Sequence, residues 1–343
     1  MTIHQKTRLI GGVWNDLIII ATLYWLVIGI GIDVWAHFNG HTDNTFWTPW
    51  HGILYSGLLA VIAATLRIPI LNARHGYQVE KIVPPGYQWT MLGTIVSVIG
   101  GLADVAWHLA FGVETNIASQ YSPSHLLLAI GLILLMSGPF TALLLRSRVG
   151  KQLTWSSALA GILSFGGSWA FLRALLLYLS PYESVLPSAQ LYKAMIDQNN
   201  TFERLAIALG TSSLYWEVLF FIVPFILIGK RIRLPFGGWT LMYIIGPILL
   251  SAVQFHFQAL PAALLIGLAM DVVAWRTDLR KTTKTCLSLI SAGLGSFFGL
   301  AYFISLALNG GSWYVVHVWT GTIFICGALG AAIAIIMTVS AET

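Results

Sequence analysis

The stretch Asp33-Val34-Trp35-Ala36-His37, followed by Thr48-Pro49-Trp50-His51, occurs twice in this chain in slightly altered form. The second copy is Asp104-Val105-Ala106-Trp107-His108, followed by Ser122-Pro123-Ser124-His125. The copies are offset by 71 residues at the Asp and the first His, and by 74 residues at the last His. An acid and two histidines form a set of metal ligands, so the repeat predicts a duplicated metal-binding hairpin.

The chain around this repeat is strongly apolar. Of its 343 residues, 57% are hydrophobic and 9% are charged, whereas soluble domains carry about a quarter charged residues. Apolar runs of about 20 residues recur along the whole length, which predicts a multi-pass membrane protein. Two cysteines are too few for a disulfide framework or a thiolate-rich site. The net charge of +5 fits basic loops at a membrane and gives no sign of nucleic-acid binding.

We expect an all-α bundle of ten transmembrane helices. The expected ranges are 14–38, 49–72, 87–111, 123–146, 153–180, 205–229, 237–257, 259–275, 286–308 and 314–338. The Leu260-Pro261 break leaves open whether the seventh and eighth segments are two helices, one kinked helix, or partly re-entrant. Residues 1–150 are expected to hold the duplicated hairpins and residues 151–343 six further helices, within one membrane domain.

The basic residues predict the orientation in the membrane. Fifteen of the 18 Lys and Arg residues fall at alternate connections, starting from the N-terminus. By the positive-inside rule, both termini are then cytoplasmic, which agrees with an even number of helices. We expect a multi-pass protein of a prokaryotic plasma membrane. Its expected partners are the lipid bilayer and either other membrane subunits or further copies of the chain, with no nucleic acid.

Helix geometry is expected to bring together the ligands of each copy. Asp33 and His37 are four residues apart and share one helix face. Thr48 is a good N-cap and Pro49 a good first helical residue, so His51 falls in the first turn of the next helix. The connection is short, so the two helices are antiparallel neighbours with their ligands at one extracytoplasmic depth. The second copy repeats this pattern with Asp104, His108 and His125.

Other titratable residues are expected at the same level. His41 continues the face of the first Asp and His, Glu114 lies in an outer loop, and His256 and His317 lie at outer helix ends. We regard these four as further metal ligands or as groups that hydrogen-bond the ligands. A histidine at a helix end is more often an interfacial side chain bonded to a carbonyl, which is the alternative for His256 and His317.

Beside the aspartates of the repeat, three of the charged residues within the expected helices bear on the fold. Arg173 and Glu217 lie in consecutive helices, which predicts a buried ion pair, with a proton relay as the alternative. Asp16, near the start of the first helix, is expected at the depth of the membrane interface.

The duplicated motif resembles the C subunit of the copper membrane monooxygenases, which oxidise methane or ammonia. That subunit carries an Asp-x3-His-x12-His site ending in Thr-Pro-Ser-His, and a second cluster of the form Asn-x3-His-x13-His. Here Asp33, His37 and His51 fit the second spacing, with Asp in place of Asn. The other copy has the Ser-Pro-Ser-His ending and a Trp107-His108 pair like the family's, with a spacer four residues longer. The resemblance covers about residues 30–130.

The resemblance implies a copper site at Asp104, His108 and His125 that activates dioxygen, with Asp33, His37 and His51 as a partner site. It implies a small apolar or ammonia-like substrate and additional subunits, but it assigns no catalytic residue in this chain. The residues alone leave three alternatives open. These are a zinc-dependent hydrolase with Glu114 or Asp43 as the base, a metal-uptake or metal-delivery protein, and a haem-binding electron carrier.

Overall fold

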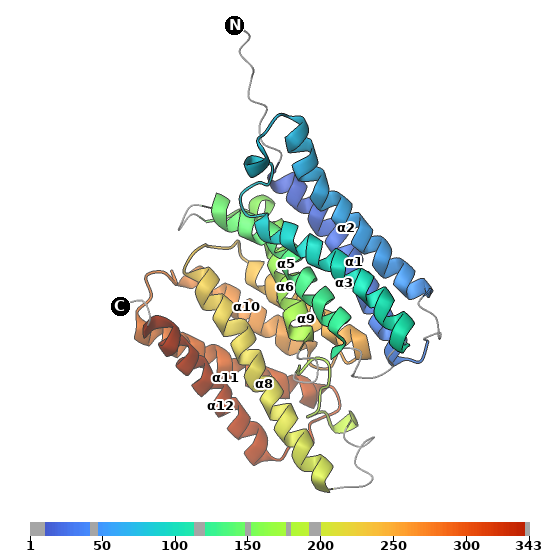
Figure 1. Cartoon of the computed structure of the whole chain (residues 1–343). Helices are drawn as coiled ribbons and strands as arrows, with labels where there is room; N and C mark the ends of the chain where they lie inside the picture. The colour runs from blue at the N-terminus through green and yellow to red at the C-terminus, as the bar shows by residue number, and fades with distance from the viewer. Residues whose placement is uncertain are drawn as a thin grey trace. The chain divides into compact units, whose positions relative to one another are not determined.

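The computed structural model describes residues 11–41, 47–112, 121–147, 152–175, 180–191 and 200–339. Within these ranges the chain is all-α, and its only β-type pairings are two isolated bridges (Figure 1). The helices are α1 (Val13–Phe38), α2 (Pro49–Arg74), η1 (Val79–Lys81), α3 (Gln88–Phe111), α5 (Pro123–Arg146), α6 (Trp155–Ala174), α8 (Asn200–Gly229), α9 (Gly238–Gln254), α10 (Leu260–Arg276), α11 (Lys284–Leu308) and α12 (Val316–Val339).

Each of the ten expected α-helices is present, but not all of them are long and apolar enough to cross a membrane. Seven described helices qualify, namely α1, α2, α3, α5, α8, α11 and α12. The break before Pro261 separates two helices, because α9 ends at Gln254 and α10 begins at Leu260. Each of these two has 17 residues, roughly 25 Å of helix, against a hydrocarbon core of about 30 Å.

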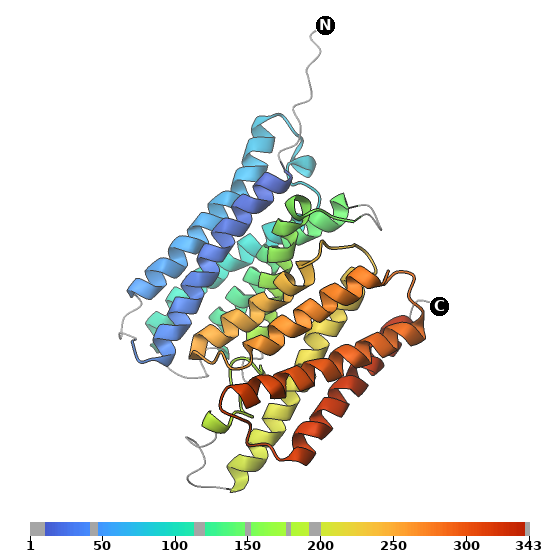
Figure 2. The ribbon, with the colours of Figure 1, turned by 180° about the vertical axis from the view of Figure 1, so that it is seen from behind.

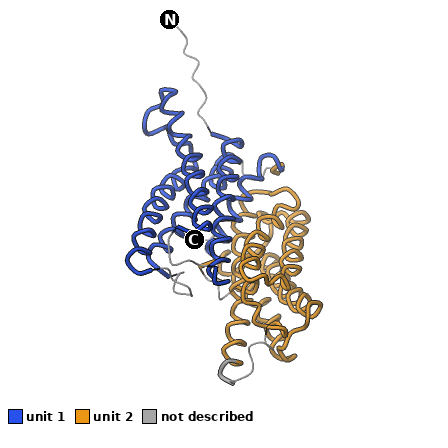
Figure 3. The backbone as a smooth tube through the Cα atoms, turned by 90° about the vertical axis from the view of Figure 1, so that its right-hand side faces the viewer, with its two compact units in different colours: residues 1–147, 155–172 blue, residues 148–154, 173–343 orange. Residues whose placement is uncertain are grey.

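The chain divides into two compact units (Figure 3). Unit 1 contains residues 1–147 and 155–172, and unit 2 contains residues 148–154 and 173–343. Helix α6 therefore belongs mainly to unit 1, although the sequence suggested a boundary near residue 150. Helix α6 is bonded to α5 next to Pro139, which itself lacks a backbone donor. The Ser164 hydroxyl of α6 donates to the Met136 carbonyl and accepts from the Phe140 N–H of α5.

Unit 1 is built on two helical hairpins, α1–α2 and α3–α5, whose helices lie side by side (Figures 1 and 2). Glycines allow close backbone contact in the first hairpin. A Cβ atom on Gly29 would lie 2.8 Å from the Leu54 Cα, and one on Gly57 would lie 2.7 Å from the Leu26 Cα. The same contacts recur at the same offsets in the second hairpin, at Gly100 against Leu128 and Gly131 against Ser97. The duplication therefore extends to the helix packing, as expected of membrane helices that associate through small residues.

The two hairpins are also joined by a buried charge cluster near the start of α1. Asp16 is only 1% exposed, forms an ion pair with Arg146 at the end of α5, and accepts a hydrogen bond from the Tyr87 hydroxyl. The expected depth of Asp16 at the membrane interface stays a prediction. Its charge is paired inside the protein, which offsets part of the cost of burying a carboxylate.

Candidate metal centre

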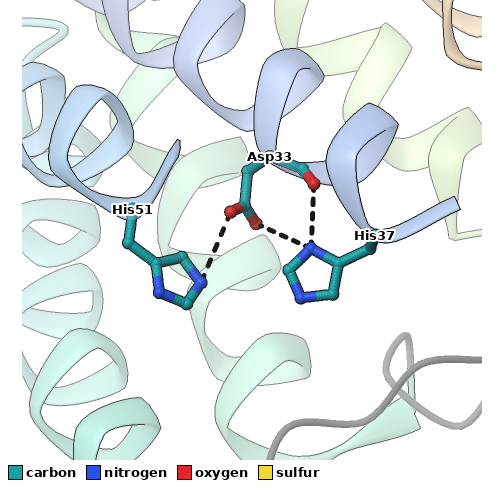
Figure 4. Close-up of side chains that lie close together, drawn as sticks. All are labelled: Asp33, His37 and His51. Atoms are coloured by element: carbon teal, nitrogen blue, oxygen red, sulfur yellow. Dashed lines mark hydrogen bonds and ion pairs between the residues drawn. The ribbon is translucent and has the colours of Figure 1, made fainter. Parts of the chain in front are cut away.

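The first cluster consists of Asp33 and His37 on α1 and His51 on α2 (Figure 4). His51 Nε2 lies 3.4 Å from Asp33 Oδ1, and His37 Nδ1 lies 3.7 Å from Asp33 Oδ2. The same Nδ1 also lies 2.8 Å from the Asp33 backbone carbonyl oxygen. Thr48 caps α2 as expected, since its hydroxyl accepts a hydrogen bond from the His51 N–H at 3.2 Å. The cap and the following proline fix His51 in the first turn.

The second cluster repeats this arrangement with Asp104 and His108 on α3 and His125 on α5. Asp104 Oδ1 lies 3.5 Å from His108 Nε2 and 3.0 Å from His125 Nε2. His108 Nδ1 lies 3.1 Å from the Gly112 carbonyl oxygen. If that nitrogen carries the ring proton, the Nε2 lone pair is directed at the cluster, the usual arrangement of a metal-ligating histidine. Ser122 caps α5 by accepting from the His125 N–H at 3.4 Å.

The donor sets fit a transition-metal ion. In each cluster, one ligand atom per residue can be chosen so that all lie within 4.8 Å of one another. Ligands held at about 2.0–2.2 Å from a tetrahedral ion lie roughly 3.3 Å apart, and the carboxylate-to-imidazole distances are 3.0–3.7 Å. Asp33 Oδ1 and Asp104 Oδ1 are buried and make no hydrogen bond of normal geometry with described residues. A buried carboxylate oxygen in that state is suited to a bound cation.

The two clusters are neighbours, since the ring centroids of His51 and His108 are 5.9 Å apart. Within each cluster the corresponding distances are 6.0 Å, between His37 and His51, and 5.6 Å, between His108 and His125. Four imidazoles and two carboxylates therefore form one continuous group across α1, α2, α3 and α5.

Tyr55 connects the two clusters and was not anticipated. Its hydroxyl donates a hydrogen bond to Asp104 Oδ2 at 2.7 Å, and its ring lies 6.2 Å from that of His51. Tyr55 follows His51 by four residues, so it shares the same face of α2. That spacing was visible in the sequence, but a tyrosine at helical spacing is usually a packing residue and gave no separate signal.

The three other expected site histidines, which the structure describes, are not part of either cluster. The ring of His41 stacks on Trp35, with a centroid distance of 5.2 Å. His256 and His317 belong to unit 2, where His256 Nδ1 lies 2.6 Å from the Glu183 carbonyl oxygen and His317 is exposed near the start of α12. Glu114 and Asp43 lie outside the described residues.

Unit 2 contains the expected ion pair. Arg173 and Glu217 are 3% and 2% exposed and pair with each other. Glu217 also accepts a hydrogen bond from Tyr243, whose hydroxyl lies 2.8 Å from that of Tyr182. The guanidinium lies over the Tyr243 ring at 4.9 Å, and a Cβ on Gly246 would occupy its space. This buried network confirms the pairing, whereas the proton relay stays a prediction.

Glu183 makes the stability of the fold depend on pH. Its side chain is buried, Oε2 has no hydrogen-bond partner among the described residues, and burial raises its pKa to about 7. Because the fold disfavours the charged carboxylate, stability should decline between about pH 4.5 and pH 7, by roughly 3 kcal/mol. Glu183→Gln should remove this decline, as measured by thermal unfolding in detergent across that range. The exposed Glu80→Gln should retain it, and an unchanged profile in Glu183→Gln would contradict the assignment.

No model of a known protein family matches the chain, and no curated protein or solved structure matches it either. The sequence and fold define the class on their own. The chain is a multi-pass helical membrane protein with two buried Asp/His/His clusters that have the composition and spacing of metal sites.

Proposed function

We propose that this protein is a copper-binding membrane metalloprotein that uses its two clusters as a pair of adjacent metal sites. The observation that carries the proposal is the contact between His51 and His108, which places one complete donor set beside the other. We further propose that it acts as a subunit of an oxidising membrane enzyme, in line with the resemblance to the copper membrane monooxygenases.

The donor types support copper. Each cluster offers imidazole nitrogens and carboxylate oxygens and no sulfur. Such sites suit copper, zinc or iron, and among the divalent first-row ions copper binds them most strongly. Three protein ligands leave coordination positions open for a substrate or co-substrate. Bound copper would supply the redox chemistry with dioxygen, while the residues of the chain hold and orient the ion.

The surroundings of the clusters support a small, apolar or uncharged substrate. Helix α3 carries exposed apolar side chains directly after His108, with Leu109 78% and Phe111 71% exposed. In this proposal these side chains face lipid, and a substrate dissolved in the bilayer approaches from that direction. In this proposal the aspartates compensate the charge of the ion, and the backbone carbonyl at Gly112 orients the His108 ring.

Two alternatives use the same residues. A zinc hydrolase is compatible with the ligand spacing, but it also needs a general base. A metal-delivery protein needs a polar path toward the other side of the membrane. In unit 1, Asp16 at the opposite end of α1 pairs with Arg146 and accepts a hydrogen bond from Tyr87. Because this carboxylate already has partners, it is a poor relay ligand, which favours a fixed metal centre over a conduit.

Elemental analysis of the purified protein tests the proposal. Wild type should retain two copper ions per chain after mild purification in detergent. His37→Ala and His108→Ala should each retain one ion, and the double variant none. His75→Ala, an exposed histidine just beyond α2, is the matched control and should retain both. Zinc in place of copper would favour the hydrolase. Absence of stoichiometric metal, or full retention in the double variant, would overturn the proposal.

A further inference from the structure

Among the described residues, one of the two cluster aspartates, Asp104, accepts a hydrogen bond from a side chain other than the cluster histidines. Asp104 Oδ2 accepts the Tyr55 hydroxyl at 2.7 Å, while Oδ1 faces His108 and His125. The repeat places Ala129 at the position equivalent to Tyr55, 74 residues later. Alanine has no donor, and no hydroxyl donates to Asp33 among the described residues. The duplication is therefore broken at this pair of positions.

The histidines of the α1 and α3 helices differ as well. In His108, Nδ1 lies beside the Gly112 carbonyl oxygen and Nε2 lies beside Asp104, so each nitrogen faces a different group. In the first copy, His37 Nδ1 faces both the carbonyl and the carboxylate of Asp33 (Figure 4). If this nitrogen is to bind an ion beside Asp33, it has to give up the carbonyl.

The aspartate and the first histidine are also more buried in the second copy than in the first. The side chains of Asp33 and His37 are 13% and 18% exposed, against 4% and 2% for Asp104 and His108. The last histidine shows the opposite trend, with 8% for His51 and 31% for His125. The Asp–His pair that each helix supplies on its own is thus more deeply buried in the second copy.

We infer that the two metal sites are unequal. The Asp104 site binds its ion first and more tightly because Tyr55 holds the carboxylate, whereas the Asp33 site binds its ion more weakly. This inference rests on the proposed function. Tyr55 acts as a positioning residue, since it touches the ligand and not the ion. Residues that hydrogen-bond a metal ligand typically contribute 10–100-fold in affinity.

The test uses Cu²⁺ titration of the full-length protein against a competing chelator. His37→Ala isolates the second site, and His108→Ala isolates the first. We expect the second site to bind Cu²⁺ at least about tenfold more tightly. Adding Tyr55→Phe should weaken the second site by about 10–100-fold and alter its Cu²⁺ electron paramagnetic resonance spectrum, while leaving the first site's affinity and spectrum unchanged.

Tyr24→Phe is the matched control, because it removes a tyrosine hydroxyl that donates to the Leu163 carbonyl in the same unit and touches no cluster. It should change neither affinity. Suppose that wild type binds two ions. Equal affinities in the two single-site variants would then overturn this inference, and so would equal weakening of both sites by Tyr55→Phe. If wild type binds no Cu²⁺ stoichiometrically, the proposed function itself fails, so the two failures are distinguishable.

Discussion

Glu217→Leu is expected to lower the free energy of unfolding by about 3–5 kcal/mol. The change leaves the Arg173 guanidinium in a site that is 3% exposed, without its carboxylate partner. It also removes the acceptor of the Tyr243 hydroxyl. A buried charge without a partner costs far more than the pair contributes when it is intact. The loss should appear in thermal or denaturant unfolding of the protein in detergent micelles.

The double variant Arg173→Met/Glu217→Leu distinguishes this cause from simple loss of packing. Removal of both partners leaves no buried charge, so the double variant should recover most of the stability lost in Glu217→Leu. Glu203→Leu, at an exposed position of the same helix, should have little effect. If the double variant loses more stability than Glu217→Leu does, charge compensation is not the reason for the pairing.

Gly29→Ala is expected to destabilise unit 1 and to weaken the first metal site. A Cβ at this position would lie 2.8 Å from the Leu54 Cα and 2.9 Å from its backbone nitrogen, so α1 and α2 must separate. Overpacking of this kind typically costs about 1–3 kcal/mol. Because Asp33 and His51 lie on these two helices, the separation should also weaken metal binding at the first site. Unfolding experiments and Cu²⁺ titration of the His108→Ala background measure the two effects.

Gly31→Ala provides a control two residues away on the same helix. A Cβ at Gly31 would meet no atom within 4 Å, and alanine favours a helix by about 1 kcal/mol over glycine. This variant should therefore be as stable as wild type or slightly more so, with unchanged metal binding. Equal losses in the two variants would show that close helix contact at Gly29 is not what the fold requires.

Much of unit 1 could be predicted from the sequence because the signals are local. Helix ends are encoded by the caps Thr48 and Ser122 and by the prolines that follow them. The ligand sets then follow from helix periodicity and a short connection. The same logic located the ten described α-helices, since each is an apolar run ended by polar residues. Orientation in the membrane and the identity of the metal stay predictions.

The rest depends on tertiary contacts that leave no periodic pattern. Helix α6 belongs to unit 1, where its Ser164 bonds backbone groups of α5, a contact that depends on another helix. Tyr182 lies in the connection after α6, yet it is fully buried and reaches Tyr243. Its polar and proline-containing surroundings show no apolar periodicity that would mark Tyr182 as buried. Tyr55 was missed for a related reason, because its importance depends on Asp104, a residue of the other hairpin.

The packing of unit 1 also bears on how the protein arose. Helix α1 contacts α5 while α2 contacts α3, so the relation between the hairpins is the reciprocal one of a twofold homodimer. A single ancestral hairpin that paired with an identical copy would have carried two identical sites facing a symmetry axis. After fusion of the two copies into one chain, each copy can change its sequence independently of the other. Tyr55 and Ala129 mark a position at which the two halves of the repeat differ, in keeping with the inference of two unequal sites.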